Sequence, residues 1–271
     1  MPTGIRLNKY LASCGMESRR GCDGLIQAGR VEINGQPCLE PGTRVQPDDH
    51  VRVDGKRVVM KRSTTILLNK PRGLICTKED ELKRETIYAL LPGALQHLHH
   101  VGRLDVDSEG LLLMTNDGDL TQRLMHPSHG MEKEYLVTCD QSYQNEHLDL
   151  LITGIYTESG KLRAKSVKRL SARRLQIILD QGAKRQIRVM LDALGYQVTK
   201  LVRVRIGSLW GGDLEVGDYR ILTAEEVEKA LVNPAPPKRS GAVTAQSLLH
   251  GKSLVKSADL SLIHISEPTR P

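Results

Sequence analysis

The feature that most constrains this chain is a series of short apolar runs between residues 65 and 206 that are not joined by regular helices. The runs read TILLNK, GLLLMT, KEYLVTC, RLQIILD and KLVRVRI, and each has the length and composition of a strand. Short helical segments such as GDLTQRLMH and KRQIRVMLDALG interrupt the series. A doubly wound parallel sheet needs a helical crossover after nearly every strand. The sequence therefore predicts an α+β fold with a mixed, mostly antiparallel sheet flanked by helices.

A separate small module is expected before this sheet. Apolar residues at near-helical spacing in IRLNKYLASCG predict a first helix, and Ser18 can cap a second helix that ends at Gly29. The alternation of residues 31–33 then leads into the turn pair Asn34-Gly35, which is typical of a hairpin. A helix–helix–hairpin unit results.

Composition sets the domain limits. Residues 56–65, KRVVMKRSTT, are charged and aperiodic and are interpreted as a linker, so the expected domains are 5–62 and 63–232. The second domain should close with the helix TAEEVEKAL, whose Thr223 and Glu226 form a capping-box pattern. Residues 233–271 are rich in Pro, Ser, Ala and Lys and predict a disordered tail, whose end, SLIHISEPTRP, resembles translated vector sequence.

Several classes of protein are not favoured by the sequence. There is no run of about 18 apolar residues, and MPTGIRLNKY has no apolar leader region, so a cytoplasmic protein without a membrane partner is expected. The five cysteines are widely spaced without a C-x-x-C pair, which favours neither a disulfide framework nor a zinc site. The histidines in QHLHHVG lack accompanying ligands at suitable spacing, so no metal is expected.

The charge of the chain is segregated. The net charge is +7, yet residues 66–160 carry 8 Lys/Arg against 15 Asp/Glu, whereas residues 161–205 carry 13 against 2. Such a concentration of like charge repels itself unless anions bind nearby, which favours a phosphate backbone as partner. A solvated basic face without a ligand remains the alternative.

The first module carries its own basic side chains. These group on the helix pair and suit RNA phosphates, to which Ser18 and free backbone N–H groups at a helix start could add contacts; the expected RNA-binding residues are Arg6, Lys9, Ser18, Arg19, Arg20 and Arg30. A purely structural basic helix pair is the alternative. The R-L-x-K-x-L, S-R and V-x-(I/V)-N-G elements resemble the small RNA-binding domain named after ribosomal protein S-four. Asp48-Asp49 stands where that family usually shows Gly-Asp, a departure confined to a turn.

A carboxylate in the string GRLDVDSEGLLLMTNDGDL, residues 102–120, is the candidate for chemistry. Arg103 and Asp105 flank Leu104 on an expected extended segment, so their side chains should share a face and form an ion pair. A neighbouring guanidinium keeps a carboxylate ionised, as a nucleophile or a general base must be. An ordinary salt bridge in a loop rich in Asp and Gly is the alternative.

The whole string resembles the catalytic motif of ribosomal RNA pseudouridine synthases that carry the S-four-type domain. Three further stretches agree in order and spacing, LNKPRGLICT near residue 70, KEYLV at 133–137 and QGAKRQIRVM at 181–190. The resemblance covers residues 5 to about 232. It departs from the family at His100, where proline is frequent, and at Val189, which replaces a second arginine.

The resemblance implies a set of site residues. Asp105 would be the essential aspartate, Tyr135 would pack on the target uracil, and Arg188 would pair with the aspartate. A flipped uracil needs an aromatic or apolar platform, and a chain with no Phe and one Trp offers few besides tyrosine. The other pocket residues expected are Lys70, Arg103, Arg185, Gln186 and Ile187. A half-buried strand tyrosine and a phosphate-binding arginine are the alternatives for Tyr135 and Arg188.

The implied reaction is the isomerisation of uridine in ribosomal RNA, without a metal or a small-molecule cofactor. A monomer is the simplest expectation. Two other functions stay open: a non-catalytic RNA-binding or ribosome-assembly factor on a synthase scaffold, and a hydrolase that uses Asp105, Asp107 and Glu109 as acid and base.

Overall fold

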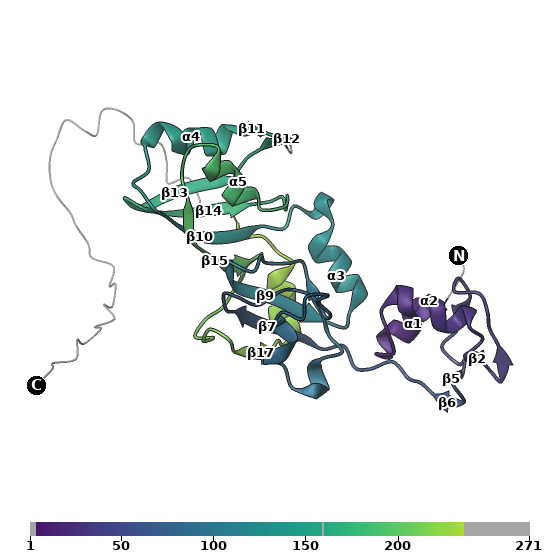
Figure 1. Ribbon diagram of the computed structural model, residues 1–271. Helices are drawn as coiled ribbons and strands as arrows, with labels where there is room; N and C mark the ends of the chain where they lie inside the picture. Colours follow the sequence, from purple (N-terminus) through teal and green to yellow (C-terminus); the bar gives the residue numbers. More distant parts are fainter. Residues whose placement is uncertain (1–3, 159, 236–271) are drawn as a thin grey trace, which may run out of the picture. The chain divides into compact units, whose positions relative to one another are not determined.

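The computed structural model describes residues 4–158 and 160–235, and its first elements form a small helix–helix–hairpin module (Figure 1). The helices are α1 (Leu7–Ser13) and α2 (Arg19–Gln27). A four-stranded sheet follows in the order β3-β2-β5-β6, with β2 Val31–Ile33, β3 Gln36–Pro37, β5 Val51–Val53 and β6 Lys56–Arg57, while β1 (Ile5–Arg6) pairs with β4 (Arg44–Val45). The predicted order of elements in this module is confirmed.

Local residue chemistry explains the module. The Ser18 hydroxyl accepts a hydrogen bond from the Gly21 N–H at 3.0 Å and so begins α2, as predicted. Asn34-Gly35 and Asp54-Gly55 both have positive φ angles, 52° and 79° in the first pair and 50° and 73° in the second, which suits tight hairpin turns. Because the second turn folds Lys56–Arg57 back along β5, the prediction of a linker from residue 56 is wrong at its start.

The largest sheet of the described residues has nine strands. Their bounds are β7 Thr65–Lys70, β8 His99–Val101, β9 Glu109–Thr115, β10 Lys133–Cys139, β13 Ser166–Ser171, β14 Arg174–Leu179, β15 Val198–Ile206, β16 Leu209–Trp210 and β17 Tyr219–Ile221. The order is β13-β14-β10-β15-β9-β7-β17, with β16 on β15 and β8 on β9. Among these strands only β15 and β9 pair in parallel, so the predicted mixed, mostly antiparallel sheet is confirmed.

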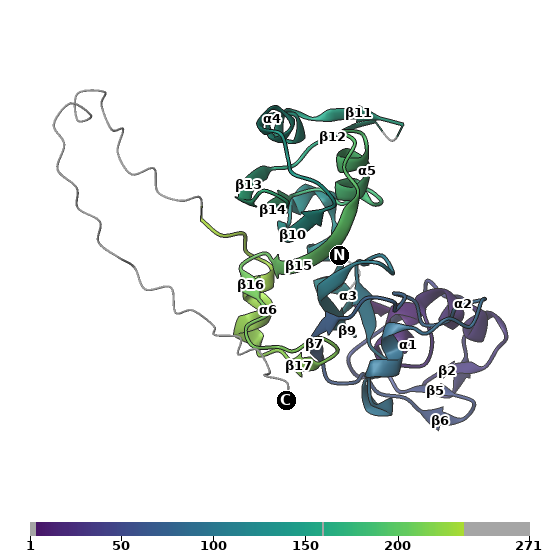
Figure 2. The same ribbon diagram turned by 60° about the vertical axis from the view of Figure 1, so that its left-hand side comes forward.

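Helices cover parts of this sheet (Figures 1 and 2). Helix α4 (Asn145–Thr153), helix α5 (Gln186–Asp192) and the hairpin of β11 (Ile155–Thr157) with β12 (Gly160–Leu162) lie over β13, β14 and β10. Helix α3 (Gly118–Met125) and helix α6 (Ala224–Ala230) pack against the other half of the sheet, and short 3-10 turns occupy Ile87–Leu90, Gly93–Leu95 and Pro127–His129. The capping box of Thr223 and Glu226 is present. No helix in the described part of the chain has the length and apolarity to cross a membrane.

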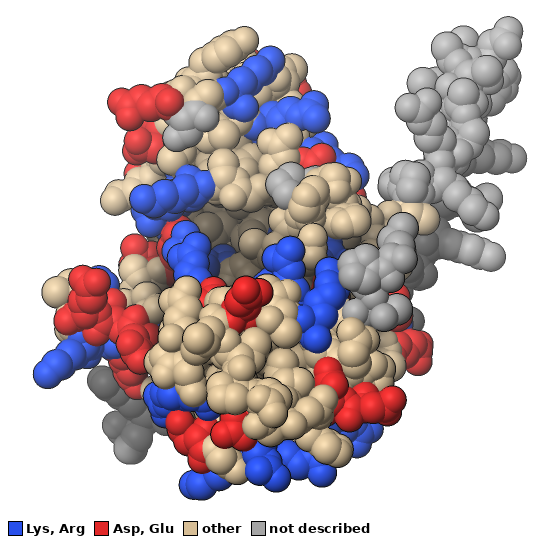
Figure 3. All heavy atoms as spheres, turned by 90° about the vertical axis from the view of Figure 1, so that its right-hand side faces the viewer, with Lys and Arg blue, Asp and Glu red and all other residues tan. Residues whose placement is uncertain are grey.

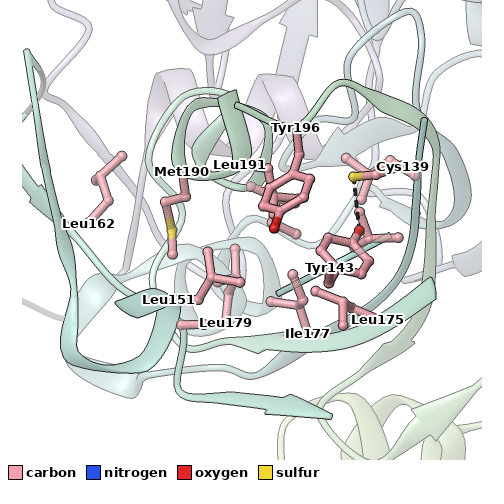
Figure 4. Close-up of a cluster of buried hydrophobic side chains, with 14 residues drawn as sticks. Cys139, Tyr143, Leu151, Leu162, Leu175, Ile177, Leu179, Met190, Leu191 and Tyr196 are labelled. Atoms are coloured by element: carbon pink, nitrogen blue, oxygen red, sulfur yellow. Dashed lines mark hydrogen bonds between the residues drawn. The ribbon is translucent and has the colours of Figure 1, made fainter. Parts of the chain in front are cut away.

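Separate apolar cores support the two halves of the sheet. In the cluster shown in Figure 4, Tyr143 and Tyr196 pack with aliphatic residues of β10, β14 and α5, and the Tyr143 hydroxyl hydrogen-bonds the Cys139 sulfur at 2.9 Å. A second cluster fills one face of β7 and β9, and a third fills the opposite face beneath α3 and α6. Tyr135 contacts the first two clusters and therefore lies where the halves meet.

Two arginines of the basic stretch 161–205 are buried in the fold. Arg203 is 5% exposed and Arg205 is 2% exposed. Arg205 bridges Glu132 at 3.1 Å and Glu134 at 2.7 Å, and Lys165 also reaches Glu132. These two cations therefore do not belong to the exposed basic charge that favours a phosphate partner, because β15 lies inside the sheet between β10 and β9.

The parallel contact of β15 with β9 depends on a glycine. Gly110 has a φ of +104°, and a Cβ placed on it would lie 2.2 Å from the Arg203 carbonyl oxygen. Only glycine permits this approach of the two backbones. The close contact therefore fixes where β9 begins after the preceding loop.

The chain remains ordered slightly beyond the predicted end of the second domain. The Asn233 side chain accepts from the Glu132 N–H at 2.8 Å and donates to the Gly130 carbonyl oxygen at 3.0 Å, so the expectation of a disordered tail from residue 233 is wrong at its start. The remainder of that expectation, residues 236–271, lies outside the described residues.

Candidate active site

Asp105 lies in the loop of residues 102–108, between β8 and β9. Gly102 enters the loop with a φ of +72°, and the Ser108 N–H closes a turn on the Asp105 carbonyl oxygen at 3.0 Å. The Asp105 side chain is 34% exposed. Residues 103–105 belong to no strand, so the strict alternation that predicted an Arg103–Asp105 pair does not apply to them.

The ion pair of Asp105 is made by Arg185. Their side chains approach to 3.5 Å between Nη1 and Oδ2, and both remain partly exposed. Arg185 precedes α5 and has a left-handed backbone with a φ of 53°, a conformation that is unfavourable for residues other than glycine. The sequence had placed Arg185 in the pocket but had assigned the ion pair to Arg188 and Arg103.

Arg188 binds the same loop through its backbone. Its Nη2 donates to the Asp107 carbonyl oxygen and its Nη1 to the Val198 carbonyl oxygen, each at 3.0 Å. Burial lowers the pKa of Arg188, and the neighbouring charge of Arg185 acts in the same direction. The prediction that Arg188 pairs with the aspartate is corrected, because backbone oxygens already occupy both ends of its fork.

Lys70 holds the loop from the other side. Its side chain is fully buried, and Nζ donates to the carbonyl oxygens of Pro71, Asp105 and Ser108 at 3.0, 3.2 and 2.9 Å. Burial lowers its pKa. Lys70 was expected to line the pocket, but it lies beneath the loop, where three oxygens compensate its desolvation.

A pocket of about 560 Å³ opens beside Asp105. Predicted residues from three segments line it: Arg103, Asp105, Tyr135, Arg185, Gln186 and Ile187. Tyr135 lies on β10, directly opposite Arg203 of β15. Gln186 accepts from the Ala183 N–H at 3.2 Å and donates to the Arg163 carbonyl oxygen at 2.8 Å, which fixes the wall that carries Arg185. The structure thus brings together the predicted pocket residues apart from Lys70 and Arg188.

The basic residues of the first module lie on or beside its helix pair. Arg6 precedes α1, Lys9 lies on α1, and Arg19 and Arg20 begin α2. Lys9 forms an ion pair with Asp119 at 2.7 Å. Arg30 forms a two-pronged ion pair with Asp54, at 2.9 and 2.5 Å. Its charge is therefore largely balanced within the module. On the face of the molecule drawn in Figure 3, Lys and Arg side chains stand at several points around a hollow, beside acidic and uncharged residues.

Two pocket residues were not singled out from the sequence. Lys133 is separated by one residue from Tyr135 on the same strand, and Asp180 follows the last residue of β14. The alternation of KEYLV could have identified Lys133, since residues i and i+2 of a strand project to one face. No comparable pattern marks Asp180.

A basic RNA-binding-like module followed by an open pocket, whose largely apolar lining holds a paired carboxylate, defines the class of an enzyme that acts on RNA. Comparisons with known proteins agree with this class. Residues 64–193 match the family model described as RNA pseudouridylate synthase, and residues 5–51 match the model of the S4 domain.

Relatives extend the match over most of the chain. An uncharacterised RNA pseudouridine synthase of Mycobacterium leprae is 40% identical over 234 residues, which cover 83% of this chain and 91% of the relative. The ribosomal large subunit pseudouridine synthase B of Bacillus subtilis is 36% identical over 230 residues, covering 83% and 94%. A crystal structure of a pseudouridylate synthase superposes with a TM-score of 0.62 at 31% identity, covering 84% and 100%. The chain belongs to the RNA pseudouridine synthase family.

Proposed function

We propose that the protein isomerises uridine in ribosomal RNA and that the Asp105 carboxylate initiates the reaction. The observation that carries this proposal is the position of Asp105 in the pocket, paired with Arg185 and facing the space that Tyr135 also lines. Ribosomal RNA is the proposed substrate because the Bacillus subtilis relative is named for the ribosomal large subunit and the chain matches the S4 domain model.

The reaction rearranges bonds without changing the composition of the RNA. The bond from N1 of uracil to C1′ of ribose breaks, the base turns, and a bond from C5 to C1′ forms. One proton leaves C5 and one is taken up at N1. An ionised carboxylate can serve by attacking the ribose or by removing a sugar proton. The guanidinium of Arg185 lies 3.5 Å from this carboxylate.

The other pocket residues have separate tasks in this proposal. Tyr135 forms the platform on which the flipped uracil packs, since it lies on a rigid strand between two apolar clusters. Gln186 and Ile187 shape the wall beside it, and Arg103 lies at the pocket where it can meet RNA phosphate. Lys70 and Arg188 act indirectly, as positioning residues that hold the Asp105 loop.

The first module supplies affinity for the RNA. Arg6, Lys9, Arg19 and Arg20 offer cations to the phosphate backbone, and the first turn of α2 adds backbone donors next to Ser18. The free energy of these contacts offsets the cost of taking a base out of its stack, which is roughly a few kcal/mol.

The decisive experiment replaces Asp105 by Asn and maps pseudouridine in large- and small-subunit ribosomal RNA transcripts. We expect product formation to fall by about 10²- to 10⁴-fold or more, with RNA affinity nearly unchanged, because only the acid–base or nucleophilic group is lost. Asp107→Asn is the matched control. Its carboxylate faces Arg72 at 3.6 Å, and its activity should stay within a few fold of the native level.

The outcomes separate the rival functions. Substantial turnover by Asp105→Asn would reject the role given to Asp105. If the native chain bound RNA tightly but formed no pseudouridine, a non-catalytic RNA-binding factor would be favoured. If the native chain gave a product of altered mass or a cleaved strand, a hydrolase would be favoured. Equal losses in the Asp105 and Asp107 variants would also favour the hydrolase.

A further inference from the structure

Three polar side chains at the inner wall of the pocket have no task in the proposed chemistry. Lys133 begins β10 opposite Leu179, and Asp180 follows Leu179 directly. Arg203 lies on β15 opposite Tyr135. All three line the same pocket as Asp105 and Tyr135, so they are available to whatever group rests on the tyrosine ring.

Two of these side chains carry buried polar atoms without a partner. Arg203 is 95% buried, and its Nε donates to the Leu111 carbonyl oxygen at 2.6 Å, which fixes the guanidinium in place. Its Nη2 and the Oδ1 of Asp180 are both buried and find no hydrogen-bond partner among the residues that the structure describes. Buried polar atoms are nearly always paired in folded proteins, so such orphans at a pocket point to a ligand.

Lys133 is also short of acceptors. Within the described residues its Nζ makes no salt bridge or hydrogen bond. Burial lowers its pKa to about 8, and the charge of Arg203 acts in the same direction, whereas Asp180 opposes the change. A desolvated ammonium beside an unpaired carboxylate oxygen gives this wall both a donor and an acceptor.

We propose that this wall reads the hydrogen-bonding edge of the uracil, with Asp180 accepting from N3–H and Lys133 and Arg203 donating to the two carbonyl oxygens. One acceptor and two donors are the complement of the single donor and two acceptors on that edge. Cytosine presents an acceptor at N3 and an amino donor beside it, so it would face Asp180 with no proton to give. The inference rests on the proposed function and names the groups that select the base.

The same wall suits the base throughout the reaction. A half-turn about the axis through N3 and C6 brings C5 to the place of N1, leaves N3–H where it was, and exchanges the two carbonyl groups. Asp180 therefore keeps its partner, and each cation exchanges one carbonyl oxygen for the other. Such a site can retain a detached uracil on Tyr135 and accept pseudouridine as readily as uridine.

The test is binding of mononucleotides to the full chain by saturation-transfer NMR. The probes are the 5′-monophosphates of uridine, pseudouridine, 3-methyluridine and cytidine. We expect the first two to bind with similar affinity. The last two should bind at least about tenfold more weakly, because each leaves a buried group unpaired.

Variants assign the effect to the wall. Asp180→Leu should lower the affinity for uridine 5′-monophosphate to that for the 3-methyl probe. Asp192 is an exposed carboxylate on α5, and the control variant Asp192→Leu should bind the probes as the native chain does. Lys133→Met should lower the affinity for both the uridine and the pseudouridine probe. The 3-methyluridine probe should still bind this variant more weakly than the uridine probe does. Circular dichroism confirms that the variants are folded.

Binding is read separately from turnover. The inference is overturned if the native chain binds none of the probes or does not distinguish them, or if Asp180→Leu retains the preference for uridine. A chain that prefers the uridine probe but makes no pseudouridine would sink the proposed function and keep this inference. A chain that makes pseudouridine but shows no preference for the uridine probe would overturn this inference and keep the proposed function.

Discussion

The Nζ of Lys70 lies 3.2 Å from the backbone oxygen of Asp105, so the proposed catalytic carboxylate sits on a peptide unit held by a buried cation. The same Nζ binds the Ser108 carbonyl oxygen, and Arg188 binds that of Asp107. Cations from β7 and α5 thus fix three peptide oxygens of one loop. The side chain of Asp105 is left available to Arg185 and the pocket.

Replacing Lys70 by Met should destabilise the fold by about 2–5 kcal/mol, because three buried carbonyl oxygens lose their donor. Urea denaturation measures this loss. At a temperature where the variant is folded, its turnover should fall more than its RNA affinity. Lys83→Met, at an exposed site, is the control; an equal effect on both variants would contradict the role of Lys70.

Replacing Arg185 by Gly should separate stability from activity. Glycine adopts a positive φ without strain, so the free energy of unfolding should stay the same or increase by up to about 1 kcal/mol. The melting temperature should therefore hold or rise. The ion pair to Asp105 disappears, so turnover should fall strongly. Arg185→Lys tests the charge alone, and full activity of the glycine variant would show that the ion pair is dispensable.

Gly110→Ala should be strongly destabilising, by about 3 kcal/mol or more, since the added Cβ would meet the Arg203 backbone at 2.2 Å and φ is +104°. Gly118→Ala in α3 is the matched control. It has open space around the new methyl group and should be neutral or gain up to about 1 kcal/mol. Thermal melting of both variants checks this difference. A Gly110→Ala protein that melts at the native temperature would contradict the prediction.

The stability of the chain should depend on pH through Lys133. Burial lowers its pKa to about 8, below its usual value of 10.5, so the folded state binds fewer protons than the unfolded state between these values. This contribution to stability therefore rises as pH increases from about 8. Lys133→Met should be more stable than the native chain at pH 7, and the difference should shrink by about pH 10. A difference that is constant in urea titrations at both pH values would contradict the burial of the charge.

The salt dependence of RNA binding should distinguish the basic residues of the first module. Arg19→Gln or Arg20→Gln should each reduce the slope of log affinity against log salt by about 1, as expected for one lost phosphate contact. Arg30→Gln should leave the slope nearly unchanged, because Asp54 already balances that guanidinium. Equal changes in all three variants would show that Arg30 contacts RNA as well.

Much of the fold followed from local signals in the sequence. The turns at Asn34-Gly35 and Asp54-Gly55 and the capping box at Thr223 depend on residues close in the chain, and the structure has all of them. The strand runs between residues 65 and 206 were equally local, and so the mostly antiparallel sheet was predictable.

The errors concern side chains whose partners are backbone atoms far away in the sequence. Lys70 was expected to line the pocket and Arg188 to pair with the carboxylate, yet both bind carbonyl oxygens, which leave no residue-specific pattern in a sequence. Arg103 was paired with Asp105 by an alternation that ends with β8. The burial of Arg203 and Arg205 depended on the central position of β15, which only the strand order reveals.

The parallel joint between β15 and β9 has two residue pairs, Val202 with Glu109 and Arg203 with Gly110, whereas its neighbours β7–β9 and β10–β15 share six and seven. Asp105 belongs to the half of the sheet on one side of this joint, and Tyr135, Asp180 and Arg185 belong to the other. The sheet is thus least reinforced along the line that the pocket straddles. A hinge movement there would widen or narrow the gap between carboxylate and tyrosine, and so would change the room that the pocket offers to a polynucleotide.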